Sequence, residues 1–186
     1  MLAHSQLERV VASLRGLRIT RVEYALMTGS DAGGREPLPW DHGTTHEPTH
    51  GCQLTTDMGV LFTFTWGNTF GYYGLEVFEH PVEEFLANIG EPFGPAVVPV
   101  TDHPRWQQLL GREIVETELV RVEWISGDPT PCWVRLDLGP DAMQRTTSES
   151  VWIAAGRWEG DRFQIATDDV TVIFDRTEAM RAAIMK

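Results

Sequence analysis

The chain has 186 residues, of which 42% are hydrophobic and 23% are charged, and these proportions are typical of a globular protein. They exclude intrinsic disorder, collagen-like repeats and a coiled coil, and a chain of this length can bury about 70% of its unfolded surface without a metal or a disulfide. Its 27 acidic and 15 basic residues give a net charge of −12 with no basic cluster, which argues against binding to nucleic acid or to an anionic membrane surface.

The first half of the chain is predicted to form a helix followed by antiparallel strands. Ser5 can cap a helix whose apolar residues recur at helical spacing up to Leu14, and Gly16 is placed to end it. Aromatic and threonine side chains alternate within residues 60–66, which is typical of a strand with one buried face, and Gly67-Asn68 predicts a two-residue hairpin turn after it. The other elements expected here are strands at 19–26, 52–56 and 69–78, a long loop at 28–50, and a short helix beginning at Pro81.

Residues 91–104 are rich in proline and glycine and are interpreted as a linker, although Ala96-Val97-Val98 indicates that it packs against the rest of the chain. The order of elements is expected to repeat after this linker. We expect a short helix at 106–110, strands at 112–125, 132–138, 150–158, 162–167 and 170–174, and a closing helix at 177–185.

The two halves also share a local pattern. Leu14–Ile19 resembles Leu109–Ile114, and both segments follow a short helix and open a strand. We therefore predict a β-rich α+β single domain in which residues 1–90 and 105–186 are two helix–antiparallel-strands–helix repeats, packed about a pseudo-twofold axis as one compact unit. The alternative is that Leu-x-Gly-x-x-Ile is simply common at helix-to-strand junctions.

Cysteine content and the N-terminal residues favour a cytoplasmic protein. Cys52 and Cys132 fit neither a disulfide framework nor a zinc ribbon, so two buried thiols in a reducing cytosol are expected. No basic segment followed by an apolar stretch opens the chain, so we expect no signal peptide, and the glycine-rich uncharged run at 58–75 is a poor transmembrane candidate. Arginine supplies all but one of the basic residues, which indicates a GC-rich bacterial genome.

The most specific local feature is a histidine-rich loop at residues 41–52. Three of the six histidines lie within nine positions of this loop, next to carboxylates. Imidazole and carboxylate groups together suit zinc, iron or manganese, and two histidines with one carboxylate leave open positions for water or oxygen. The spacing matches neither H-E-x-x-H nor a known zinc motif, so a polar surface loop with titrating histidines is the alternative. The candidate ligands are Asp41, His42, His46, Glu47 and His50, either as His46 and His50 with Glu47 or as Asp41 with His42.

Aromatic side chains gather around a second feature, the expected hairpin at 60–78. Several glycines lie among them, and a glycine within a strand often marks a bulge or the close approach of another group. Such aromatic residues can line a small-molecule pocket or form a homodimer interface, whereas packing in an ordinary β core is the other explanation. The candidate ligand-binding or partner-binding residues are Trp40, Trp66, Phe70, Tyr72 and Tyr73.

Signatures of several enzyme classes are missing from the sequence. It contains no P-loop, no G-x-G-x-x-G after a strand and no G-x-S-x-G elbow, and Ser148 and Ser150 have no adjacent histidine. Asp168-Asp169 is placed for a turn between two strands, and Asp175 is placed to cap the closing helix, so these carboxylates are interpreted as structural. These features favour a protein without catalysis.

Three functions fit these features. The first is a cytoplasmic binding protein without a cofactor, for example an immunity-type protein that neutralises a basic toxin. Acidity, small size and the missing enzyme motifs favour this function. The second is a small metal-dependent enzyme, a hydrolase or an oxygenase, that uses the loop at 41–52. The third is a small-molecule binding protein with an aromatic pocket.

Overall fold

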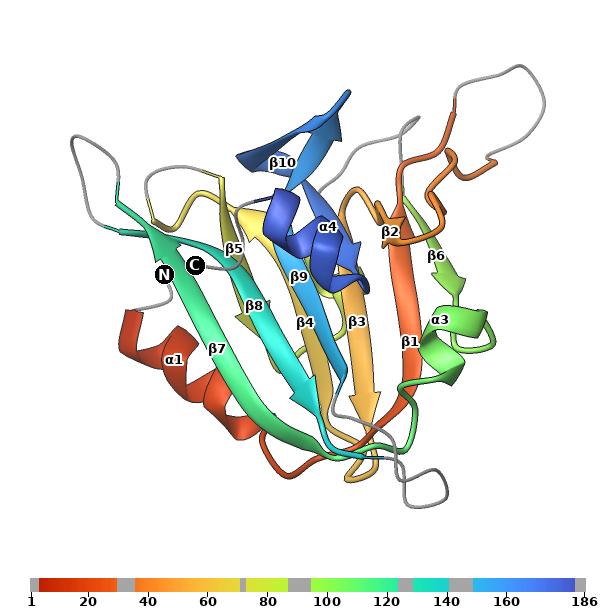
Figure 1. The fold of residues 1–186 in the computed structure, drawn as a ribbon, viewed down its shortest axis with the longest axis vertical. Helices are drawn as coiled ribbons and strands as arrows, with labels where there is room; N and C mark the ends of the chain where they lie inside the picture. The colour runs from red at the N-terminus through yellow and green to blue at the C-terminus, as the bar shows by residue number, and fades with distance from the viewer. Residues whose placement is uncertain are drawn as a thin grey trace.

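Two antiparallel sheets of five strands each lie face to face (Figure 1). This computed structural model describes residues 4–29, 36–70, 73–86, 95–123, 129–140 and 149–182. The first sheet has the order β5-β4-β3-β1-β6 and consists of β1 (Ile19–Leu26), β3 (Gly51–Thr56), β4 (Leu61–Gly67), β5 (Gly74–Phe78) and β6 (Ala96–Pro99). The second has the order β2-β10-β9-β8-β7 and consists of β2 (Thr45–His46), β7 (Ile114–Val122), β8 (Thr130–Leu138), β9 (Glu149–Glu159) and β10 (Arg162–Ile173). The predicted β-rich class is confirmed.

Four short helices accompany the sheets in the part of the chain that the structure describes. They are α1 (His4–Ser13), α2 (Val82–Leu86), α3 (Pro104–Gln107) and α4 (Arg176–Arg181). Helix α1 contacts both β5 and β7, so it closes one edge of the space between the sheets, and α4 lies against β10 (Figure 1). Of the described helices, none has the length and apolar character needed to cross a membrane.

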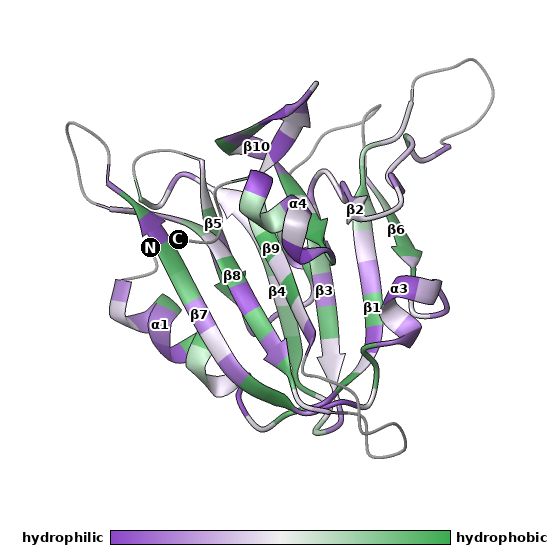
Figure 2. Cartoon of the chain, viewed as in Figure 1, coloured by the Kyte–Doolittle hydropathy of each residue, from purple (hydrophilic) through white to green (hydrophobic). Residues whose placement is uncertain are grey.

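The main core lies between the two sheets. On β4, Phe62 and Phe64 are buried in this core, while Thr63 between them faces the other side of the sheet, as the alternation in the sequence predicts. Val151 and Ile153 enter the same core from β9. The alternation is visible as bands of hydrophobic and hydrophilic colour along the strands in Figure 2.

A second, smaller core lies beneath α4, on the opposite face of the second sheet. It contains Trp133, Trp152 and Ile173 from the strands and Ala179 from α4. Asp175 caps α4, because its carboxylate accepts hydrogen bonds from the backbone amides of Thr177 (2.7 Å) and Glu178 (3.1 Å). The predicted structural role of this aspartate is therefore confirmed.

The two junctions that share a sequence pattern lie side by side. The amide of Gly16 donates to the carbonyl of Ile114 (2.8 Å), and the amide of Gly111 donates to the carbonyl of Ile19 (2.9 Å). Both glycines have positive φ, +85° and +72°, which a residue with a Cβ adopts only with strain. Two junctions with similar sequences are thus hydrogen-bonded to each other in a reciprocal way.

Alanine at either junction glycine is expected to destabilise the fold to the same extent. A Cβ at Gly16 or at Gly111 would meet no atom within 4 Å, so the backbone conformation alone sets the effect. We expect Gly16→Ala and Gly111→Ala each to lower the free energy of unfolding by about 1 kcal/mol. Urea denaturation of the two variants measures this. Costs that differ by more than about 1 kcal/mol would show that the junctions are not equivalent.

The structure corrects two details of the strand prediction. The prediction of a two-residue turn at Gly67-Asn68 is wrong. The β4–β5 ladder ends at Gly67 paired with Gly74, so the connection between the strands is longer than two residues. The strands expected at 162–167 and 170–174 are one strand, β10, whose pairing with β9 shifts register between Ile165 and Val170. Asp168-Asp169 therefore lies in a strand irregularity and not in a turn between strands. Polar residues lie at the β4–β5 connection and at the register shift in β10. Because bulges and turns have similar local composition, the sequence did not distinguish them.

Each sheet is completed by a short strand from elsewhere in the chain. Strand β6 lies within residues 91–104, the predicted linker, and pairs with β1. Strand β2 lies within the long loop predicted at 28–50 and pairs with β10. Both segments are thereby fixed at one edge of the molecule, and the functional groups described next come from them.

Both cysteines are buried and unpaired, as predicted. Burial raises the pKa of the Cys132 thiol to about 12 and raises that of Cys52 further. Neither thiol therefore has the thiolate character of a nucleophile.

Candidate functional site

A tight hairpin brings two of the predicted ligands together. Asp41 and His46 face each other in an antiparallel bridge, and the amide of His42 donates to the carbonyl of Thr45 (2.9 Å) to close the turn. The turn is stabilised by the Asp41 carboxylate, which accepts from the amide of Gly43 (2.8 Å), a residue with φ +83°. Because bridge partners point to the same face, this hairpin fixes the two side chains next to each other.

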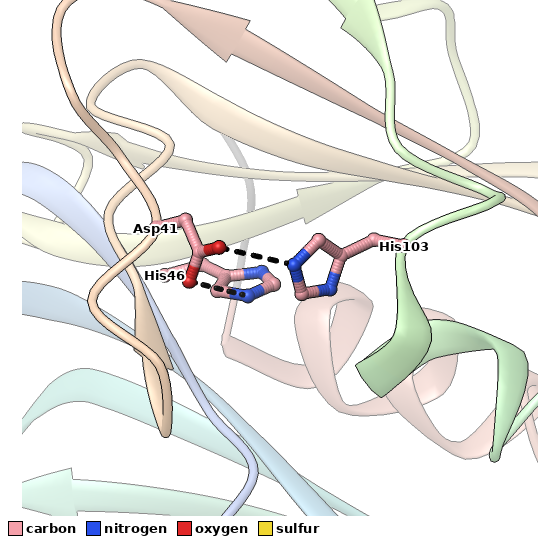
Figure 3. A group of neighbouring side chains, drawn as sticks. All are labelled: Asp41, His46 and His103. Carbon is pink, nitrogen blue, oxygen red and sulfur yellow. Dashed lines mark hydrogen bonds and ion pairs between the residues drawn. The ribbon is translucent and has the colours of Figure 1, made fainter.

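The third member of the site is His103, which precedes α3. Its Nε2 lies 3.2 Å from Oδ2 of Asp41, and its ring centroid lies 4.4 Å from that of His46 (Figure 3). The position of His103 follows from β6, which returns along β1, and from the amide of Val100, which donates to the carbonyl of Val22 (2.9 Å). His103 is an isolated histidine in the predicted linker, so no local pattern in the sequence marks it.

His46 is the most enclosed member of the site, with a side chain that is 0% exposed. Its Nδ1 lies 2.8 Å from Oη of Tyr24, and Nε1 of Trp106 donates to the same oxygen (2.7 Å). The rings of Trp40 and Phe174 pack against the imidazole at centroid distances of 4.9 and 4.7 Å. Its other nitrogen, Nε2, has no hydrogen-bond partner among the described residues and lies 3.6 Å from Oδ1 of Asp41 (Figure 3).

Burial and neighbouring charges set the protonation states of these groups. Burial, with His103 as a further cause, lowers the pKa of His46 to about 3, so its imidazole is neutral near pH 7. The amide of Gly43 and the ring of His103 lower the pKa of Asp41, which is therefore ionised. Burial raises the pKa of Tyr24 well above its usual value. The site thus combines a carboxylate with a neutral, buried imidazole.

The hydrogen bonds of His103 define its tautomer in the absence of a ligand. Its Nδ1 accepts from the amide of Arg105 (3.3 Å), where it caps α3. The ring proton is therefore on Nε2, which donates to Asp41.

The three side chains have the geometry of a metal-ligand set. One donor atom from each of Asp41, His46 and His103 lies within 4.8 Å of the others, and no other such group occurs among the described residues. Nitrogen and oxygen ligands bound about 2.0–2.2 Å from a tetrahedral metal lie roughly 3.3–3.6 Å apart. The distances from Asp41, 3.2 Å between Oδ2 and His103 and 3.6 Å between Oδ1 and His46, lie close to this range, each from a different oxygen of the carboxylate.

The other residues of the histidine-rich loop do not join this set. His42 and Glu47 form a partly exposed pair, with Nε2 and Oε2 3.6 Å apart. His50 is buried near the start of β3, where burial lowers its pKa, and its Nε2 has no hydrogen-bond partner within the described ranges. The three histidines of the loop therefore occupy three separate environments.

The predicted aromatic residues are also separated. Trp40 belongs to the surroundings of the site, between Tyr24, His46 and His103. Trp66 donates from Nε1 to the carbonyl of Thr49 (3.2 Å) and packs edge-on against Tyr73 (5.4 Å). Phe70 is buried against His4, and Tyr72 lies outside the described residues.

Comparisons with known proteins do not add to this geometry: no family model, curated protein or solved structure matches the chain.

Proposed function

We propose that the protein binds a divalent transition-metal ion through Asp41, His46 and His103. The observation that carries the proposal is the Nε2 atom of His46, which is fully buried, has no hydrogen-bond partner in the part of the chain that the structure describes and lies 3.6 Å from the Asp41 carboxylate. A buried polar atom without a partner costs about 1–3 kcal/mol in folding, and coordination would remove that cost. Two imidazoles and a carboxylate suit zinc, iron(II) or manganese.

Coordination by His103 requires one rearrangement. The proton on Nε2 must leave, the ring must carry its proton on Nδ1, and the contact with the Arg105 amide must break. A hydrogen bond of this kind contributes about 1 kcal/mol. Zinc binding in zinc-finger peptides contributes about 10–16 kcal/mol, so the loss of one such hydrogen bond is small beside the binding free energy of a zinc site of that kind.

Three protein ligands leave a coordination position for water or substrate. The Asp41 side chain is 45% exposed, so the ligand set is open to solvent on that side while His46 closes the other. A metal in such a position lowers the pKa of a bound water and polarises a carbonyl or phosphoryl oxygen. This arrangement supports the second function considered from the sequence, a small metal-dependent enzyme, over a loop without a ligand.

Replacing Asp41 with asparagine tests the proposal. Asparagine retains an oxygen that can accept the Gly43 amide, so the hairpin stays formed, but the ligand charge is lost. We expect Asp41→Asn to weaken zinc binding at least about 100-fold in a competition titration of metal-free protein with a chromophoric chelator.

Asp102→Asn is the matched control, because Asp102 is exposed next to His103 and does not belong to the ligand set. It makes the same change in net charge and should bind zinc like the wild type. Equal affinity in all three proteins, or no binding of zinc, iron(II) or manganese by the wild type, would refute the site.

The other functions considered from the sequence stay predictions. An acidic cytoplasmic protein that neutralises a basic toxin is supported by the net charge of −12. A small-molecule pocket or homodimer face at the β4–β5 hairpin is supported only by the partial exposure of Trp66 and Tyr73.

We also propose that the two halves are repeats related by a pseudo-twofold axis. The reciprocal hydrogen bonds of Gly16 and Gly111 support it, since both pairs, 16 with 111 and 19 with 114, have the same sequence offset. The strand order supports it as well. Residues 19–78 supply four adjacent strands of the first sheet, and residues 114–173 supply four adjacent strands of the second.

A further inference from the structure

We propose that the protein has a second binding site, separate from the metal ligands, for the phosphate or carboxylate group of a small molecule. The site is a cavity of about 490 Å³, to which α3, the first residue of α4, and strands β8 and β9 all contribute. Cavities of roughly 300–1,000 Å³ are typical of small-molecule sites. None of the three proposed metal ligands lines it.

Arginine side chains give the cavity its chemistry. Arg105, Arg135 and Arg176 all line it, although the chain as a whole carries a net charge of −12. Arg135 is already paired, with Glu118 (2.9 Å) and Asp137 (3.1 Å). The other two have no carboxylate partner among the described residues, and this sets them apart in a protein with acids in excess.

The two unpaired arginines differ in how they are held. Arg105 donates from Nε to the carbonyl of Gly43 (3.0 Å), which fixes the guanidinium and leaves its two terminal nitrogens to bind a ligand. The exposed Arg176 side chain has no hydrogen bond or ion pair within the described part of the chain. One anchored guanidinium and one without a partner in the described part of the chain can together bind an oxyanion with paired hydrogen bonds.

The carboxylates of the cavity do not neutralise these arginines, because each has another partner. Asp137 accepts from the hydroxyl of Ser150 (2.7 Å) and pairs with Arg135, and Glu149 pairs with Arg112 (3.1 Å). Among the described residues, the four arginines of the cavity and its ion pairs outnumber the three carboxylates by one, and Arg105 and Arg176 are the two without a carboxylate partner. An anion is the ligand that satisfies them.

The apolar part of the lining limits the rest of the ligand. Trp152 and Phe174 line the cavity beside the arginines, so a flat or short apolar group attached to the anion would find a surface to pack on. Phe174 also packs against His46, so the same residue lines the cavity and contacts the buried histidine. The two sites are neighbours without shared ligands, and the anion site does not depend on the metal.

Titration of metal-free full-length protein with inorganic phosphate and, separately, with succinate tests the proposal. Thermal unfolding is followed at constant ionic strength with chloride as the replaced anion. We expect a saturable rise in the melting temperature with at least one of the two anions, and the anion that saturates at the lower concentration identifies the preferred group. Arg176→Gln and Arg105→Gln should each weaken that binding at least about tenfold.

Arg162→Gln is the matched control, because Arg162 is exposed at the start of β10, lies outside the cavity and has no ion pair in the described part of the chain. It should bind like the wild type. A rise that does not saturate, or one reduced equally in the Arg162 and Arg176 variants, would overturn the proposal in favour of general screening of charge. Zinc binding by Arg176→Gln should be unchanged, so failure of one site is distinguishable from failure of the other.

Discussion

Replacing Trp106 with alanine is expected to lower the free energy of unfolding by about 3–5 kcal/mol. Trp106 is 0% exposed and is the largest fully buried side chain among the described residues. It packs edge-on against Phe174 (5.1 Å between centroids) and donates from Nε1 to Oη of Tyr24 (2.7 Å). The substitution leaves a large cavity and deprives a buried hydroxyl of its donor, and both effects destabilise the fold.

Trp106→Phe separates these two effects. Phenylalanine keeps most of the ring volume but cannot donate to Tyr24, whose hydroxyl keeps its hydrogen bond with His46. We therefore expect a loss of about 1 kcal/mol from the missing hydrogen bond with a small contribution from packing. Denaturation by guanidinium, followed by circular dichroism, measures both variants. A loss below about 1 kcal/mol for the alanine variant would mean that α3 does not anchor the edge of the core as described.

Zinc at a hundredfold its dissociation constant is expected to raise the free energy of unfolding by about 2.7 kcal/mol. For a chain of this size the corresponding rise in melting temperature is about 5–10 °C. The reason is that two ligands come from the hairpin that includes β2 and the third precedes α3, so the set exists only when β2 and β6 are in their sheets. Zinc therefore binds the folded state in strong preference to the unfolded chain.

Differential scanning calorimetry of metal-free and zinc-loaded protein checks this linkage. Asp41→Asn should unfold near the wild-type temperature without zinc, because the side chain is partly exposed and asparagine can still accept from the Gly43 amide, and zinc should shift it little. Asp102→Asn should show the full zinc shift. A shift of the same size in both variants would place the metal at other residues.

Much of the secondary structure could be predicted because it depends on local patterns. The strand expected at 19–26 is β1 with the same bounds, and the alternation at 60–66 predicted which side chains of β4 enter the core. Asp175 was recognisable as a cap because a cap acts on amides only two and three residues away. Such features need no knowledge of the distant chain.

The candidate site was predictable only in part. The cluster of histidines and carboxylates at 41–52 drew attention to the loop that supplies Asp41 and His46. The same cluster also included His42, Glu47 and His50, because density along a sequence does not say which side chains share a face. The bridge between Asp41 and His46 makes that selection, and it depends on the turn at Gly43.

The sequence by itself determined the β-rich class, the burial of alternating side chains and the acidic charge, because each depends on composition or on neighbours within a few residues. Only the tertiary structure decided that β2 and β6 would complete the two sheets, and that His103 would meet Asp41 and His46. It also decided that two arginines would share a cavity without carboxylate partners among the residues that the structure describes. These outcomes depend on contacts between residues far apart in the chain. Sheet pairing and core packing determine such contacts, and no local sequence pattern predicts them.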